Sequence, residues 1–183
     1  MQLLFKEIKT DIDISEITGL ASEIWNSHYP SIIGQKQVDY MINKMYSVTS
    51  LKEQIFRKHN IFIGAYLNQK LAGFISYSNT YERDYFIHKL YVDMKIHSKG
   101  IGRALYETAF MDKEVKTIRL TVNRQNIKAV NFYFRLGFII EKIIDIDIGE
   151  GFVMNDFVML LQKINPGHFK FSLSYIRNTF ISV

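Results

Sequence analysis

Apolar positions recur along the chain with two different periods. In the first 60 residues, after a short apolar opening that predicts a strand, they return every three or four positions, as at Ile14, Ile17 and Leu20. That spacing places apolar side chains on one face of a helix. From residue 61 on, shorter apolar runs take over, and these predict strands. The pattern therefore predicts a mainly helical first third, followed by strands mixed with helices.

The second part of the chain is expected to form an α/β sheet. Residues 61–78 hold two apolar runs around Asn68-Gln69, and Asn tolerates the positive φ of a tight turn, so a β-hairpin is predicted. Further strands are predicted over 85–94, 117–122, about 138–146 and about 156–161, and helices over 101–111 and 126–136. This order predicts a mixed sheet with helices on both faces.

The chain of 183 residues has no repeat, low-complexity tract or linker before Pro166, so we expect one domain over residues 1–165. Asn165-Pro166-Gly167 predicts a break. Apolar and polar residues alternate over 169–175, which fits an edge strand or a partner surface, and a disordered end is equally open. The aromatic tail, 166–183, also leaves a homodimer open.

The composition narrows the class of protein. There is no cysteine, which removes disulfides and a thiol nucleophile. The first residues lack the pattern of a signal peptide, and no apolar run approaches the ~20 residues that span a bilayer, so we expect a cytoplasmic protein without a membrane partner. The net charge of +5 favours anionic ligands, but the basic residues are spread along the chain, and nothing points to nucleic acid.

The segment HSKGIGRAL, residues 97–105, joins a predicted strand to the start of a predicted helix. Backbone N–H groups and the helix dipole at such a turn favour an anion, above all a phosphate. A P-loop is excluded because Arg103 and Ala104 follow the second glycine, where Lys and Ser or Thr would be needed. The dinucleotide fingerprint is excluded because Leu105 stands at its third glycine.

The remaining phosphate pattern is [Q/R]-x-x-G-x-[G/A], which HSKGIG resembles with His97 at the first position. Downstream, VNRQNIKAVNFYFRLGF, residues 122–138, matches N-x-x-A-x-x-[FL]-Y-x-x-x-G-F. In this order and separation the two motifs resemble the GNAT superfamily of N-acetyltransferases, over about residues 60–162. The resemblance implies a mixed, mostly antiparallel central sheet of about six or seven strands, with helices on both faces.

Residues 23–47 and 147–159 resemble bacterial GNAT members grouped with the PaiA-type polyamine acetyltransferases. The resemblance implies transfer of an acetyl group from acetyl-CoA to a small amine, polyamines first, in a ternary complex without a metal. An N-terminal protein amine or an amino-sugar antibiotic stays open as acceptor. A second hypothesis, which His97 favours, is an acyl-CoA-binding regulatory module that has lost catalysis.

The resemblance also implies which residues bind acetyl-CoA. The strand residues Leu90, Tyr91 and Val92 would pair with the pantetheine arm and offer an N–H to the oxyanion. Turn residues would hold the pyrophosphate through backbone amides and through the charges of Lys99 and Arg103. These are His97, Ser98, Lys99, Gly100, Ile101, Gly102 and Arg103. Asn126 either only caps a helix or also contacts the cofactor.

Tyr133 is the expected general acid. A phenol with a pKa of about 10 can donate a proton to the departing thiolate. The alternative is a core aromatic residue, because Phe132 and Phe134 flank it in sequence.

His88 is the candidate for the base. It is expected to share a strand face with Leu90 and Val92, and an imidazole with a pKa of about 6.5 can accept or relay the proton of an alkylammonium. The alternative is a structural histidine. Glu82 and Asp84, just before this strand, are candidates for attracting a cationic amine, or are only solvated.

Overall fold

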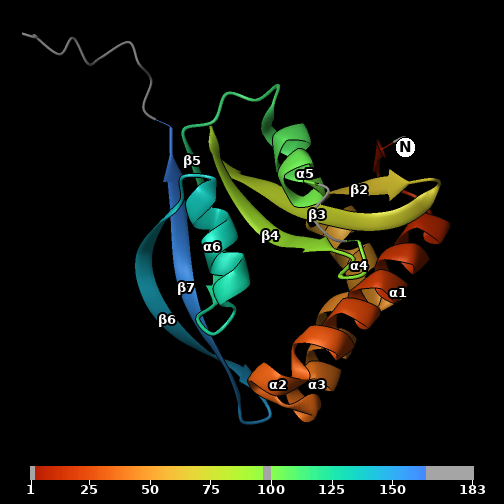
Figure 1. The fold of residues 1–183 in the computed structure, drawn as a ribbon, viewed down its shortest axis with the longest axis vertical. Coiled ribbons are helices and arrows are strands. Elements are labelled where there is room, and N and C mark those ends of the chain that lie inside the picture. Colours follow the sequence, from red (N-terminus) through yellow and green to blue (C-terminus); the bar gives the residue numbers. More distant parts are fainter. Residues whose placement is uncertain (1–2, 97–99, 164–183) are drawn as a thin grey trace, which may run out of the picture.

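The computed structural model describes residues 3–96 and 100–163 (Figure 1). In chain order its elements are β1 (Leu3–Glu7), α1 (Asp11–His28), α2 (Pro30–Ile33), α3 (Gln35–Tyr46), α4 (Val48–Lys52), the π-helical η1 (Glu53–Arg57), β2 (Ile61–Leu67), β3 (Lys70–Tyr81), β4 (Asp84–Val92), α5 (Ile101–Phe110), β5 (Thr117–Asn123), α6 (Ile127–Arg135), β6 (Ile139–Gly149) and β7 (Phe152–Gln162). The predicted tail, 166–183, lies outside the described residues.

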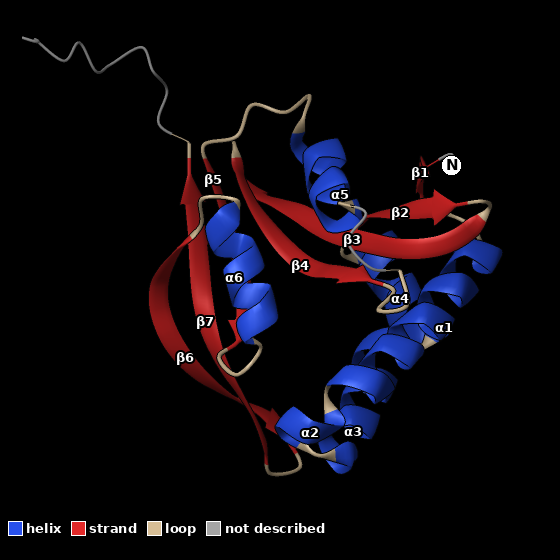
Figure 2. Cartoon of the chain, viewed as in Figure 1, coloured by secondary structure: helices blue, strands red, loops and turns tan. Residues whose placement is uncertain are grey.

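The seven strands form one sheet in the order β1-β2-β3-β4-β5-β7-β6. Every neighbouring pair is antiparallel except β4 and β5. Helices α5 and α6 cover one face of the sheet, and α1 with α3 lies against the other (Figure 2). The predicted mixed, mostly antiparallel sheet with helices on both faces is confirmed.

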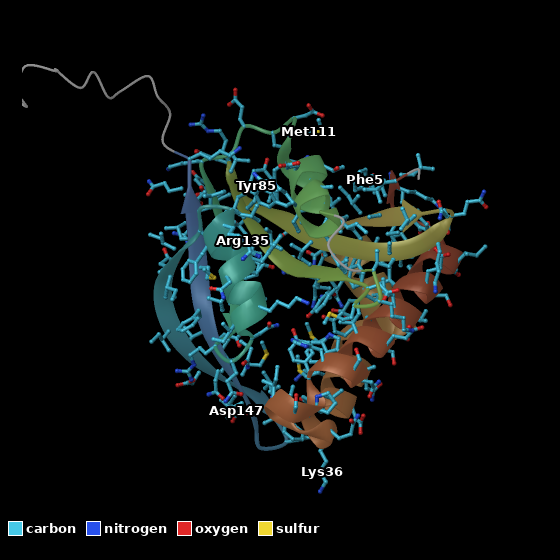
Figure 3. All side chains as sticks on the ribbon, viewed as in Figure 1. Phe5, Lys36, Tyr85, Met111, Arg135 and Asp147 are labelled. Carbon is cyan, nitrogen blue, oxygen red and sulfur yellow. The ribbon has the colours of Figure 1, made fainter. Side chains whose placement is uncertain are left out.

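Two apolar clusters hold these layers together, one on each face. The first lies under α5 and α6 and includes the fully buried Leu105 and Ile118. The second lies under α1 and α3 and includes Ile14, Leu51 and Phe74, all at 0% exposure. Side chains fill the space between sheet and helices (Figure 3). Because the sheet is covered on both faces, a ligand gains entry most readily where its strands separate.

Local sequence signals place the turns. Asn68 and Gln69 adopt φ of 50° and 66° between β2 and β3, as expected for a two-residue hairpin turn. Gly137 follows α6 with φ of 93°, so it ends the helix in the left-handed region. The predicted hairpin and the predicted end of α6 are both confirmed.

The last hairpin is longer than predicted, because β6 reaches Gly149 and β7 begins at Phe152. The turn between them uses positive φ at Gly149, Glu150 and Gly151, so pairing runs up to the turn. β6 is an edge strand with mostly exposed side chains, and because many of its residues are polar, the apolar pattern alone does not show its full length.

None of the described helices is both long and apolar enough to cross a membrane.

Candidate active site

Strands β4 and β5 separate part-way along their length. Their parallel pairing joins Asp84–Ile87 to Thr117–Leu120 and then stops, although both strands continue. The strands therefore diverge in a V (Figure 1). A cleft of about 1010 Å³ lies at this opening, with lining residues from the sheet and from helices on both of its faces.

One edge of β4 is unpaired along this opening. The N–H of Asp93, just after β4, donates to the carbonyl of Ala72 in β3 at 2.8 Å. Backbone groups of successive strand residues point to opposite edges, so the N–H groups of Leu90 and Val92 point away from β3 and toward the opening. Both residues line the cleft. This edge can pair with an extended ligand and offer N–H groups to a developing oxyanion.

The start of α5 lies beside this edge. Gly100 has φ of 67° just before the helix, a conformation that favours glycine. Gly102, in the first turn of α5, faces the Phe132 ring of α6, where an added Cβ would lie 3.4 Å from the ring, in ordinary van der Waals contact. Gly100, Ile101, Gly102 and Arg103 all line the cleft. The predicted His97, Ser98 and Lys99 lie outside the described residues, and the pyrophosphate site stays a prediction.

Tyr133 lies on α6 with its side chain 7% exposed, and it lines the cleft. Its ring packs edge-to-face against Phe132 and Phe138, at centroid distances of 5.3 and 5.5 Å. Burial raises the pKa of Tyr133 above its ordinary value, so the phenol keeps its proton at neutral pH. The residue is thus both a core aromatic and a proton donor that faces the cleft, and its catalytic role stays a prediction.

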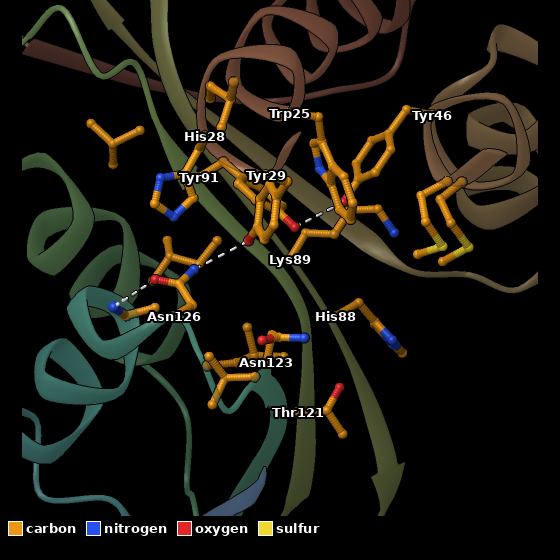
Figure 4. A pocket seen from close by; sticks show the side chains of 18 of the residues that line it. Trp25, His28, Tyr29, Tyr46, His88, Lys89, Tyr91, Thr121, Asn123 and Asn126 are labelled. Carbon is orange, nitrogen blue, oxygen red and sulfur yellow. Dashed lines mark hydrogen bonds between the residues drawn. The ribbon is translucent and has the colours of Figure 1, made fainter. Parts of the chain in front are cut away.

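Asn126 connects α6 to the N-terminal helices. Its side chain accepts a hydrogen bond from the Ala129 N–H at 3.1 Å, which confirms the predicted cap, and donates to the Tyr29 hydroxyl at 3.3 Å (Figure 4). Tyr29 stacks on Trp25 at 4.3 Å. Asn126 therefore also fixes the end of α1 across the cleft. Its contact with a cofactor stays a prediction.

His88 does not share a face with Leu90 and Val92, and this prediction is wrong. Ser76 pairs with Lys89 while Tyr77 pairs with Ile87, so His88 is the extra residue of a β-bulge. Such a bulge interrupts the alternation of side chains. The His88 Nε2 atom lies 2.8 Å from the Ser78 Oγ, whereas Leu90 and Val92 pack against the core under α5 and α6.

The surroundings of His88 make it a weak base. His88 is exposed at the surface of the cleft, but partial desolvation and the neighbouring Lys89 and Lys58 ammonium groups lower its pKa to about 4. An imidazole with such a pKa is neutral at pH 7 but takes up a proton poorly. Its role as base stays a prediction. Glu82 and Asp84 are not among the residues that line the cleft, and Asp84 accepts a hydrogen bond from Thr117 at 2.7 Å.

Sequence reasoning missed Asp156 on β7. This residue is 2% exposed, lines the cleft and lies opposite Asn123 of β5 in the sheet. Burial raises its pKa to about 6, although Thr121 and Arg124 act in the other direction. The only available signal was an acidic residue within the apolar run FVMNDFVMLL, which does not show which face it occupies.

Sequence reasoning also missed Lys89, which is 4% exposed in the wall formed with the N-terminal helices. Its Nζ donates to the Gln54 Oε1 at 2.5 Å and lies 5.3 Å from the centre of the Tyr46 ring. Burial, with Lys58 nearby, lowers its pKa to about 8. The hydroxyl of Tyr46 donates to that of Tyr91 at 3.1 Å, so this wall is aromatic as well as basic.

Within residues 3–96 and 100–163, no group of three or more His, Asp or Glu side chains could hold a metal ion. The acidic run from Asp145 to Gly149 lies in β6. The described part of the cleft contains backbone N–H groups, phenols, the buried carboxyls of Asp93 and Asp156, and the buried amine of Lys89.

The family model described as "Acetyltransferase (GNAT) family" matches residues 21–138. The fold and the opening between β4 and β5 accordingly define an acetyltransferase. The chain belongs to the GNAT acetyltransferase family. The match begins in α1, well before the region near residue 60 where the sequence motifs start. No curated protein matches the chain.

Several solved structures are similar to this chain. The PaiA N-acetyltransferase of Thermoplasma acidophilum, solved with coenzyme A, is 26% identical, with a TM-score of 0.72 over 89% of this chain and 100% of that one. A GCN5-related N-acetyltransferase from Rhodopseudomonas palustris has a TM-score of 0.72 at 13% identity, covering 89% and 97%. Ard1 from Thermoplasma volcanium has a TM-score of 0.67 at 18% identity, covering 90% and 100%. The last two comparisons show the shared fold alone.

Proposed function

We propose that this protein transfers the acetyl group of acetyl-CoA to a primary amine, directly, within a ternary complex. The observation that carries the proposal is the unpaired edge of β4 at Leu90 and Val92, which opens into a cleft beside the start of α5. Membership of an acetyltransferase family supports acetyl-CoA as the donor. The coenzyme A bound in the similar Thermoplasma acidophilum structure supports it as well.

The proposed donor site uses backbone groups and scattered positive charge. Acetyl-CoA would lay its extended arm along the β4 edge and its pyrophosphate against the first turn of α5. Arg103, Lys128 and Arg135 line this part of the cleft or its rim and would attract the phosphates. When bound, acetyl-CoA supplies the activated thioester.

The proposed reaction needs a neutral amine, a stabilised oxyanion and a proton for sulfur. The amine nitrogen forms a bond to the thioester carbonyl carbon, and charge gathers on the carbonyl oxygen near the β4 N–H groups. The C–S bond then breaks, its electron pair stays on sulfur, and the thiolate takes the proton of the Tyr133 hydroxyl. The surplus proton on the amide nitrogen returns to the tyrosinate through solvent, so the acetylated amine and free thiol are the products.

For the acceptor we propose a small primary amine, with polyamines and diamines as the first class to test. That choice rests on the resemblance of residues 23–47 and 147–159 to PaiA-type enzymes, and it is supported by the similarity to the PaiA structure. On the same resemblance we propose a PaiA-like bacterial branch. From the absence of cysteine in the composition we propose the cytoplasm as the compartment.

The test combines binding with turnover. Calorimetry with acetyl-CoA is followed by thiol release on adding spermidine, putrescine, butylamine or a peptide with a free N-terminus. We expect saturable binding and amine-dependent thiol release. Binding without release on any of these amines would favour the regulatory module over the enzyme, and absence of binding would contradict the donor site.

A further inference from the structure

We propose that Asp156 is the acceptor subsite: its carboxylate binds the ammonium group of the amine and takes the proton that the amine must lose. This inference rests on the proposed acetyl transfer and names the residue that the acceptor meets. The candidate base from sequence, His88, lies on a bulge and is a weak base. Asp156 offers a carboxyl in the same cleft from the opposite strand, β7.

The sheet register aims Asp156 into the cleft. Asp156 pairs directly with Asn123, and side chains of directly paired residues in an antiparallel ladder lie on the same face. Thr121, two residues before Asn123, lies on that face too, and both side chains project into the pocket (Figure 4). Asp156 is almost fully buried, at 2% exposure, and it is one of the residues that line the cleft. A ligand would therefore meet its carboxyl from the cleft.

The other carboxylates that line the cleft already have partners. Glu53 forms an ion pair with Lys58 at 3.1 Å. Asp93 accepts a hydrogen bond from the Lys95 N–H at 2.9 Å, which holds the turn after β4. Glu53 is therefore already paired with a cation, and Asp93 serves the turn after β4.

Asp156, by contrast, has no ion pair within 4.0 Å among the described residues. Its basic neighbour Arg124 is instead paired with Asp145 on the outer strand β6. A buried carboxylate without a cation is costly, and an ammonium group would relieve that cost. The site is thus complementary in charge to the protonated form of an alkyl amine.

The titratable and charged groups around Asp156 leave it ionised at neutral pH. Burial raises its pKa to about 6, while Thr121 of β5 and Arg124, just after β5, lower this pKa. Tyr29, just after α1, lines the same cleft, and its phenol remains protonated because burial raises that pKa as well. His88 and Lys89 line the cleft from β4, across the opening. A carboxyl of this kind is an anion at pH 7 and a better proton acceptor than an exposed aspartate.

Asp156 also lies near the groups of the proposed chemistry. The Tyr29 hydroxyl accepts a hydrogen bond from Asn126, and Tyr29, Asp156 and Tyr133 line the same cleft. The carboxyl and the proposed acid therefore open into one cleft. An amine held by Asp156 would lie against β5 and β7, across the cleft from the free edge of β4.

The step balances in protons and electrons. The bound R–NH₃⁺ gives one proton to the Asp156 carboxylate, and the lone pair left on nitrogen forms the bond to the thioester carbon. The carboxylic acid then releases this proton to solvent after the product leaves. No oxidant, reductant or metal is needed.

The test is Asp156→Asn, with butylamine and putrescine as the probes. We expect kcat/KM for either amine to fall about 100-fold, since removal of a positioned base has effects of this order, with acetyl-CoA affinity unchanged. In the wild type, kcat/KM should fall as the pH drops below about 6, and this limb should be absent from the variant. Asp147→Asn, the same change at an exposed residue of β6 outside the cleft lining, should leave both quantities unchanged.

A stability measurement separates this role from a structural one. The Asp156 pKa is raised from 3.8 to about 6 by folding, so the wild type loses stability as the pH rises through that range. Asp156→Asn should lack this loss and be at least as stable as the wild type at pH 8. A variant that is instead less stable at pH 8 would show a structural role and overturn the inference.

The failures of the two proposals are distinguishable. If the wild type acetylates an amine and Asp156→Asn does so within threefold and with the same pH profile, the subsite is wrong and the proposed function stands. If the wild type binds acetyl-CoA but neither binds nor acetylates butylamine or putrescine, the proposed transfer to these amines is wrong, and the Asp156 subsite is overturned with it.

Discussion

The two sides of the cleft recognise their ligands by different means. The side formed by β4, α5 and α6 offers backbone groups: the free edge at Leu90 and Val92 and the glycine start of α5. The side formed by the N-terminal helices and β7 offers side chains instead, above all Asp156, and the Lys89 side chain of β4 points toward the N-terminal helices. Backbone recognition is encoded over a few adjacent residues, whereas side-chain recognition is assembled from distant parts of the chain.

Asn126 and Tyr29 join the two sides. The amide caps α6 on the proposed cofactor side, and through its hydrogen bond to the phenol it also holds the end of α1. If the two sides act separately, changes on one should affect acetyl-CoA affinity and changes on the other should affect the acceptor. The following variants test that division, from the largest expected effect on activity to the smallest.

Tyr133→Phe should have the largest effect of these variants. We expect kcat to fall about 100-fold, because the thiolate loses its proton donor, with little change in acetyl-CoA affinity. Tyr106→Phe is the control, since Tyr106 packs against the same core and has a pKa raised to about 12, but does not line the cleft. Initial rates of thiol release measure both. A wild-type rate for Tyr133→Phe would rule out the proposed acid.

Gly100→Val should weaken acetyl-CoA binding about tenfold, because a β-branched residue is strained at the φ of 67° found there. Gly151→Val is a matched control. Gly151 also has positive φ and open space around a Cβ, but it lies in the β6–β7 turn outside the cleft lining. Calorimetry should show weaker binding for the first variant only. Equal affinities in both variants would contradict a donor site at the start of α5.

Lys89→Met should change acceptor preference by about threefold, the size expected for loss of one modest like-charge repulsion. We expect kcat/KM for putrescine to rise relative to that for butylamine, because the second ammonium of putrescine no longer meets Lys89. In the wild type the same ratio should rise as the pH passes about 8, where Lys89 loses its proton. Lys113→Met, which also removes a lysine over a tyrosine ring but outside the cleft, should leave the ratio as it is.

Asp13→Ala should have the smallest effect on activity and should act on stability instead. The Asp13 carboxyl accepts hydrogen bonds from the Thr10 N–H and from Lys6 at the start of α1. Burial alone would raise its pKa, but these bonds lower it overall, so its contribution to stability is present above pH 4 and lost as the pH falls. We expect a loss of about 1–2 kcal/mol in urea unfolding at pH 7. No loss at pH 7 would contradict the capping role.

The sequence was informative where structure is local. The Asn68-Gln69 turn, the Asn126 cap and the Gly137 stop each depend on a few adjacent residues, and all three are confirmed. The predicted orientation of His88 was wrong because β4 has a bulge there. The bulge depends on pairing with β3, which the alternation of apolar and polar residues within β4 does not show.

Asp156 and Lys89 could not be identified as cleft residues for a related reason. Asp156 reaches the cleft because β7 pairs with β5, and Lys89 is buried because η1 brings Gln54 to it. Both contacts join residues more than 30 positions apart. A single sequence gives the type of such a residue but not the face or the partner that defines its chemistry.

The most direct test of acetyl transfer to an amine is to identify the product. Acetyl-CoA, the protein and butylamine or putrescine are incubated together, and free thiol and acetylated amine are quantified by absorbance and mass spectrometry. The account predicts one N-acetylated amine for each thiol released. Thiol release without acetylated amine, or no release above the protein-free control, would contradict it.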